Sequence, residues 1–149
     1  MVSARAISST PSAAMAATRS ATCCTETSPS KGQPQTQERV TDRLGAAPDA
    51  TLRLHFHDTR NTGLANAYAG VEAGIDILDA SCGGIGGCPF APGATGNIAT
   101  EDLVYMLERA GFTTSYDLGA LIDTAGWIGG QLGIRPPSAL SRAGPFPKP

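Results

Sequence analysis

The central part of the chain changes between two hydrophobic periods. Residues 51–57 alternate apolar leucines with polar side chains, which is the period of a strand. Residues 64–73 place apolar side chains three or four positions apart, as on the buried face of a helix, and Gly74 provides a C-terminal stop. Residues 75–79 predict a second strand. This order is typical of a parallel α/β unit with a right-handed crossover.

Two more helices are predicted toward the C-terminus. Thr100 is a suitable N-cap, and two acidic residues follow it in the first turn, where the helix dipole favours them. The expected buried stripe of this helix consists of Leu103, Val104, Leu107 and Ala110. Asp117 is expected to cap a last helix, which Gly129 and Gly130 would break up. The tail at 136–149 is too rich in proline to continue that helix.

Composition divides the chain into three parts. Residues 1–37 are dominated by Ser, Ala, Thr and Pro and cannot bury a core, so we expect a disordered or misread leader. The stretch before Glu26 carries arginine but no acidic residue, which is also the composition of an organelle transit peptide. Residues 38–135 form the segment with a folding pattern, including a short helix at 39–44, and residues 136–149 form a proline-rich tail.

Charge and cysteine usage narrow the class of partner. The 149 residues carry a net charge of −2, with no basic stripe for nucleic acid and no polybasic patch for a membrane surface. No apolar run approaches the roughly 20 residues that span a bilayer. Cys23 and Cys24 are adjacent in the sequence, and Cys82 and Cys88 lie in the same loop, so the four cysteines do not form the pattern of a disulfide framework. We therefore expect a small-molecule partner, no nucleic acid, no membrane and a reducing compartment.

Two histidines form the first candidate for chemistry. His55 and His57 flank Phe56 on the first predicted strand, so both rings should point to one side and offer two nitrogens to one metal ion. An isolated pair of this kind is often structural. Asn97 is a third candidate donor through its amide oxygen, with a turn or capping role as its alternative.

A glycine-rich loop at 81–97 is the second candidate. Glycine loses more conformational entropy on folding than any other residue, so such a loop predicts positive φ angles or close approach to a ligand. Cys88 lies in its middle, where a thiol can exchange protons with a substrate. The alternatives are an inert buried thiol, a Cys82–Cys88 redox pair, or a zinc site built from both cysteines and both histidines.

Three runs in this region resemble a known family. HFHDTRNTGLANAY, DASCGGIGGCPFAPGATGN and ATEDLVYML are similar to the C-terminal part of hydroxymethylglutaryl-CoA lyase, a metal-dependent enzyme family with a TIM barrel. The resemblance covers roughly residues 39–147. It implies an α/β fold, namely the C-terminal portion of a TIM (β/α)8 barrel with about two strand-helix units plus an extra C-terminal helix. A complete barrel typically needs about 250 residues.

The resemblance also implies roles for individual residues. His55, His57 and Asn97 would hold a divalent metal, Mg²⁺ or Mn²⁺. Cys88 would be the catalytic acid, with His55 as a second candidate for proton transfer. In the family, the fourth protein ligand is an Asp beside an Arg on the first barrel strand, and this chain has no such strand.

The implied reaction is cleavage of 3-hydroxy-3-methylglutaryl-CoA to acetyl-CoA and acetoacetate, as in leucine catabolism. We expect a form that is truncated at its N-terminus and inactive by itself. The alternatives are a lyase for another 3-hydroxy-acyl-CoA and a non-catalytic fragment that binds metal or associates with a partner. A homo-oligomer or complementation by the missing half of the barrel would supply the remaining strands. The expected location is the cytoplasm, or the mitochondrial matrix if the leader is a transit peptide.

Overall fold

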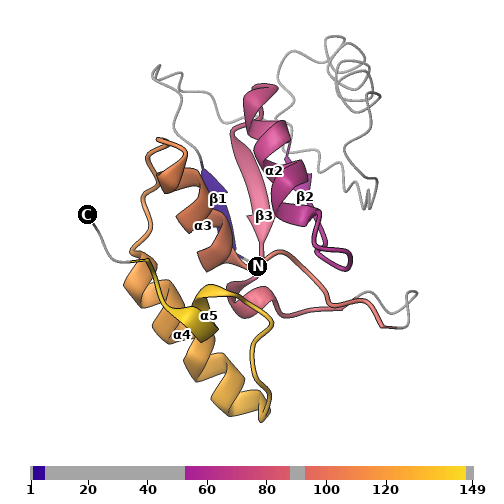
Figure 1. Ribbon diagram of the computed structural model, residues 1–149, viewed down its shortest axis with the longest axis vertical. Helices are drawn as coiled ribbons and strands as arrows, with labels where there is room; N and C mark the ends of the chain where they lie inside the picture. Colours follow the sequence, from indigo (N-terminus) through magenta and orange to yellow (C-terminus); the bar gives the residue numbers. More distant parts are fainter. Residues whose placement is uncertain (1, 6–52, 88–92, 147–149) are drawn as a thin grey trace, which may run out of the picture.

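The predicted parallel unit is present in the computed structural model (Figure 1), which describes residues 2–5, 53–87 and 93–146. Strand β2 (Leu54–His55) runs parallel to β3 (Ile77–Ala80), and helix α2 (Gly63–Glu72) connects them. His55 lies opposite Asp79 in the register. Both strands are shorter than predicted. The first ends early because the Phe56 carbonyl accepts from Ile98 instead of a β3 residue, and the second begins late because the Ile75 N–H still bonds to Gly70.

A third strand comes from an unexpected part of the chain. Strand β1 (Val2–Arg5) pairs antiparallel with β3, which gives the order β1-β3-β2 among the described strands. These four residues belong to the segment predicted as a disordered or misread leader, and they form a strand in the structure. The other leader positions and the helix predicted at 39–44 lie outside the described residues.

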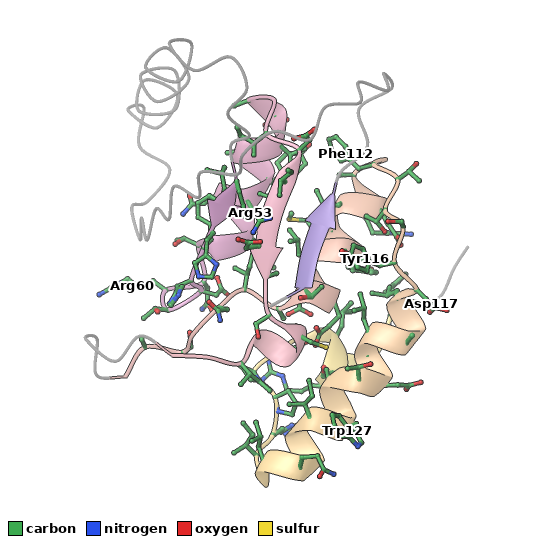
Figure 2. All side chains as sticks on the ribbon, turned by 180° about the vertical axis from the view of Figure 1, so that it is seen from behind. Arg53, Arg60, Phe112, Tyr116, Asp117 and Trp127 are labelled. Carbon is green, nitrogen blue, oxygen red and sulfur yellow. The ribbon has the colours of Figure 1, made fainter. Side chains whose placement is uncertain are left out.

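The described sheet is covered on one face. Helices α2 and α3 (Thr100–Arg109) lie on the same face, and Figure 2 shows the opposite face with no helix over it in the described part of the chain. The core between helices and strands consists of Phe56, Ala67, Val71, Leu78, Ala80, Ile98, Leu103 and Leu107. Apolar side chains at alternate strand positions fill this core, so the positions between them belong to the other face.

Helix α3 begins one residue earlier than predicted. Ala99, not Thr100, is its N-cap, and the Thr100 hydroxyl is buried without a hydrogen-bond partner. The reason lies in the segment that precedes the helix, which forms a parallel bridge between Ser81 and Ala99. The Thr100 N–H donates to the Ser81 carbonyl at 2.9 Å, so the backbone turns into the helix directly from this bridge. Ala110 is exposed and does not belong to the buried stripe.

Helix α4 (Leu118–Leu132) confirms one prediction and contradicts another. Asp117 caps it as predicted, because its carboxylate accepts from the Ala120 N–H at 3.0 Å (Figure 2). The predicted break at Gly129 and Gly130 is wrong, since the helix continues to a left-handed residue at Gly133. A Cβ on Gly129 would lie 2.7 Å from Pro136, so glycine is needed there for packing and not for a break.

The C-terminal tail returns to the body of the structure. It does not continue α4, but it contains a short helix, α5 (Leu140–Ala143), which was not predicted. The carboxylate of Asp102 accepts from the Ala139 and Leu140 N–H groups, both at 2.8 Å, and so satisfies the start of α5. In the described residues, every helix is too short or too polar to cross a membrane.

Candidate active site

The two histidines lie together at the carboxyl end of β2. Their ring centroids are 5.2 Å apart and the ring planes meet at 71°. His55 is buried and belongs to the strand, whereas His57 follows it and is half-buried. The predicted convergence of the rings is confirmed. Their role as ligands stays a prediction.

Asn97 lies beside His57, with which it forms an antiparallel bridge. Its backbone N–H donates to the Gly86 carbonyl at 3.0 Å, and its side-chain Nδ2 donates to the Ile85 carbonyl at 2.9 Å. These contacts fix which side of the amide carries the oxygen. The buried Oδ1 has no partner with hydrogen-bond geometry among the described residues. An unpaired buried acceptor is costly, which is consistent with a site that receives a ligand or cation.

Glycine is required where the loop crosses itself. Gly96 has a φ of 104°, and a Cβ there would collide with the carbonyl oxygen of Gly86. Gly86 has a φ of 108°, and a Cβ there would lie 2.8 Å from Asn97 Nδ2. The predicted positive φ angles are confirmed, and the close approach seen here is between two parts of the loop and not to a ligand. The glycines allow the two arms of the loop to approach closely enough for the carbonyls to hold Asn97.

Burial favours the neutral form of His55. Removal from water is the main reason why the pKa of His55 is lowered, and the adjacent His57 ring adds to it. The carboxylate of Asp79 and a polar contact with the Asn97 side chain oppose this shift. A neutral imidazole keeps a nitrogen lone pair available as a metal ligand or a base.

Asp79 and Asp58 support the histidines in ways that the sequence did not reveal. Asp79 faces His55 across the strand pair and forms an ion pair with Arg53 at 3.5 Å, beside β3 in Figure 2. Asp58 accepts from the Gly63 N–H at 2.8 Å and so anchors the first turn of α2 to the segment that carries His57. A carboxylate directly after HFH was visible in the sequence, but its partner was not.

The donor chemistry of the site fits a hard divalent cation. In the part of the chain that the structure describes, no group of three or more His, Cys, Asp and Glu side chains is placed to hold a metal ion. A metal site at the histidine pair would therefore need a further donor, for which the amide oxygen of Asn97 is the predicted candidate. Two imidazole nitrogens and one amide oxygen, with positions left for substrate or water, suit Mg²⁺ or Mn²⁺.

Cys82 does not join the histidines, so the alternative of a zinc site with both cysteines is not supported. Its thiol donates instead to the Leu121 carbonyl on α4 at 3.5 Å. Burial first, and then the nearby Glu101 carboxylate, raises the pKa of Cys82, while a backbone hydrogen bond from Gly83 opposes the shift. Cys88, the predicted catalytic thiol, lies outside the described residues.

Cys82 should therefore react slowly with alkylating reagents. Because the raised pKa disfavours the thiolate, iodoacetamide should modify Cys82 at neutral pH more slowly in the folded chain than in urea. The rate of modification should rise only at a pH above the ordinary pKa of a thiol. Cys88 should be modified first. Peptide mapping by mass spectrometry between pH 6 and pH 10, roughly the span of thiol titration, measures both rates. Equal rates for Cys82 in the folded and unfolded chain would contradict this.

Glu101 is a buried residue that the sequence suggested only as a helix-dipole charge. It is 0% exposed, and its carboxylate accepts from the Gly83 N–H at 3.0 and 3.1 Å and from the Ser141 hydroxyl at 2.8 Å. Acidic residues are common in a first helical turn. Only the fold shows that this one faces inward, toward the beginning of the glycine loop.

The fold and the site together define a segment of an α/β barrel, with polar side chains gathered at the carboxyl ends of parallel strands. The HMGL-like family model matches residues 25–128. The chain belongs to the HMGL-like family.

Curated relatives agree with this assignment. The chain is 51% identical over 106 residues to (R)-citramalyl-CoA lyase of Chloroflexus aurantiacus, covering 71% of this chain and 32% of that protein. It is 48% identical over 95 residues to the hydroxymethylglutaryl-CoA lyase YngG of Bacillus subtilis, covering 64% of this chain and 32% of the relative. The chain thus spans about a third of the length of the curated relatives that it matches.

Solved structures give the same result for the fold. An HMG-CoA lyase from Acinetobacter baumannii, in complex with coenzyme A and 3-methylmalate, aligns with a TM-score of 0.65 at 45% identity and covers 78% of this chain and 40% of that chain. The hydroxymethylglutaryl-CoA lyase of Pseudomonas aeruginosa aligns with a TM-score of 0.64 at 37% identity, covering 76% of this chain and 38% of that chain. The resemblance inferred from sequence and the assignment to part of a TIM barrel are confirmed.

Proposed function

We propose that this chain is the C-terminal, metal-holding part of a carbon–carbon lyase that cleaves 3-hydroxy-3-methylglutaryl-CoA to acetyl-CoA and acetoacetate. The observation that carries the proposal is the free Oδ1 of Asn97 beside two converging imidazoles. Membership of the HMGL-like family supports the reaction class. This reaction belongs to leucine degradation.

The divalent metal, Mg²⁺ or Mn²⁺, would be held by His55, His57 and Asn97. When bound, it supplies Lewis-acid chemistry that lowers the pKa of a substrate hydroxyl. His55 suits this role because its pKa is lowered and its ring is neutral near pH 7. Asn97 suits it because the Ile85 carbonyl holds the amide nitrogen and leaves the oxygen free.

The cleavage itself requires a base and an acid. The tertiary hydroxyl of the substrate loses its proton to the base and becomes the ketone of acetoacetate as the carbon–carbon bond breaks. The electron pair of that bond stays on the acetyl-CoA carbon, which then takes a proton from the acid. We assign the acid to Cys88 from its place in the GGCP sequence, with His55 as the candidate for relaying the hydroxyl proton.

A second candidate substrate is (R)-citramalyl-CoA. The 51% identity to the lyase from Chloroflexus aurantiacus favours it at least as much as the overall similarity favours the first substrate. Both acyl groups would present a tertiary hydroxyl beside a carboxylate to the same metal. The acyl-CoA is the proposed partner in either case, and a second protein segment would complete the barrel. The cytoplasm is the proposed location, with the mitochondrial matrix as the alternative.

Two chimeras test the reaction and the substrate. Residues 38–146 would replace the matching region in the Bacillus subtilis hydroxymethylglutaryl-CoA lyase and in the Chloroflexus aurantiacus (R)-citramalyl-CoA lyase. We expect metal-dependent turnover in both chimeras. In the chimera built on the Chloroflexus aurantiacus lyase, the substrate preference should shift toward 3-hydroxy-3-methylglutaryl-CoA relative to the unmodified enzyme. Chromatography of each acyl-CoA over time gives kcat/KM. Folded but inactive chimeras would refute the lyase proposal, whereas active chimeras with unshifted preference would refute only the substrate.

A further inference from the structure

We propose that Glu101 is a positioning residue, which acts with the C-terminal segment 136–143 to hold the glycine loop so that Asn97 presents its oxygen to the site. The name "loop bracket" is used here for Glu101, Ser138 and Ser141. The inference deepens the proposed function, because it assigns a role to residues that contact neither substrate nor metal.

The loop bracket holds Gly83 by both of its backbone groups. The Gly83 N–H donates to both oxygens of Glu101, at 3.0 and 3.1 Å, and the Gly83 carbonyl accepts from the Ser138 N–H at 3.3 Å. Gly83 has a φ of 73°, in the left-handed region that glycine adopts more readily than other residues. The loop begins from a point that is fixed from two sides.

The C-terminal segment, which holds the Gly83 carbonyl, is itself anchored to helix α3 by hydrogen bonds. The Ser141 hydroxyl donates to Glu101 at 2.8 Å, and the Ser138 hydroxyl donates to Asp102 at 3.1 Å. Ser138 is 2% exposed and Glu101 is fully buried, so each of these polar contacts has one partner that is shielded from water, which strengthens it. Arg142 closes the segment with a hydrogen bond from Nε to the Ser138 carbonyl at 3.0 Å.

Gly83, which the loop bracket holds, lies close in sequence to the carbonyls that hold Asn97. Gly84 follows Gly83, with its N–H on the Ser81 carbonyl at 2.9 Å. The next two carbonyls, of Ile85 and Gly86, accept from the Asn97 side chain and backbone respectively. Any shift of Gly83 therefore moves the acceptors that orient the Asn97 amide. The path from Ser141 to Asn97 thus consists of hydrogen bonds to Glu101 and Gly83, the covalent backbone of residues 83–86, and the hydrogen bonds from that backbone to Asn97.

Hydrogen exchange in the 149-residue chain tests this path. NMR would follow the Gly83 amide and the Asn97 side-chain amide in Glu101→Ala, Glu101→Gln and Ser141→Ala. Glu101→Ala should accelerate both by at least about tenfold, the effect of losing one charge-assisted hydrogen bond. Glu101→Gln keeps one acceptor oxygen and should restore most of the protection. Ser141→Ala, which removes only a hydroxyl, should give a smaller change in the same direction.

The matched controls are Glu108→Gln, on the exposed side of the same helix, and Ser115→Ala, an exposed serine. Neither should alter exchange at Gly83 or Asn97. Faster exchange at Gly83 with an unchanged Asn97 amide would overturn the positioning role, as would a uniform acceleration in α2 and α3. The readout does not depend on turnover, so inactive chimeras would refute the proposed function and leave this result intact.

Discussion

His57→Ala should abolish metal-dependent cleavage when residues 38–146 are placed in a complete barrel. The substitution removes one of two convergent imidazoles, whose ring centroids lie 5.2 Å apart, and His57 is half-buried and lies outside the hydrophobic core. Losing a single electrostatic contact to the developing charge commonly costs about a hundredfold or more in rate. We expect at least that loss in kcat/KM, measured with Mg²⁺ and with Mn²⁺.

A control separates this effect from general damage. Gln131→Ala removes an exposed polar side chain from α4, far along the chain from the histidines, and should leave kcat/KM unchanged. Circular dichroism would verify that both variants are folded. Retained activity in His57→Ala would remove this residue from the proposed ligand set.

The second large effect concerns the 149-residue polypeptide prepared alone, which should show no significant lyase activity. In the described residues the sheet has three strands, with β1 and β2 at its edges, whereas a closed barrel pairs every strand of eight. In the described residues, no helix covers the face of the sheet opposite α2 and α3 (Figure 2), and the alternation of side chains along the strands places His55 on that face. An incomplete ligand set and a barrel that does not close around the substrate both weaken electrostatic catalysis.

The assay follows acetoacetate after addition of Mg²⁺ or Mn²⁺ and 3-hydroxy-3-methylglutaryl-CoA, beside the intact lyase of Bacillus subtilis. Size-exclusion chromatography of the same sample would report whether copies associate through the unpaired strand edges. Turnover near that of the intact enzyme would contradict the prediction and show that an assembly of chains rebuilds the site.

Local patterns predicted much of the fold. The period of two before His57 and the period of three to four after Leu64 gave β2, α2 and their parallel partner in the right order. The errors have tertiary causes. Gly129 looked like a helix breaker, but its missing side chain admits Pro136 against the helix. The pairing of β1 with β3 joins segments more than 70 residues apart, which no local pattern records.

In the candidate site, the sequence predicted the histidine pair but not the surroundings of Asn97 and Glu101. Two histidines at alternate strand positions must point to one side, so their convergence followed from the sequence. The free oxygen of Asn97 did not, because it depends on carbonyls of Ile85 and Gly86 that reach it across the loop. Glu101 was misjudged for a similar reason, since its partners lie 18 and 40 positions away.

The most direct test of the metal site is the affinity of the complete-barrel chimera for Mn²⁺. Titration followed by electron paramagnetic resonance would compare the parent chimera with Asn97→Ala and Gln131→Ala. Even supporting residues around a metal typically contribute tenfold to a hundredfold in affinity, so loss of the Asn97 oxygen should weaken binding by at least about tenfold. Gln131→Ala should bind like the parent. Equal affinity in a folded Asn97→Ala variant would contradict the account.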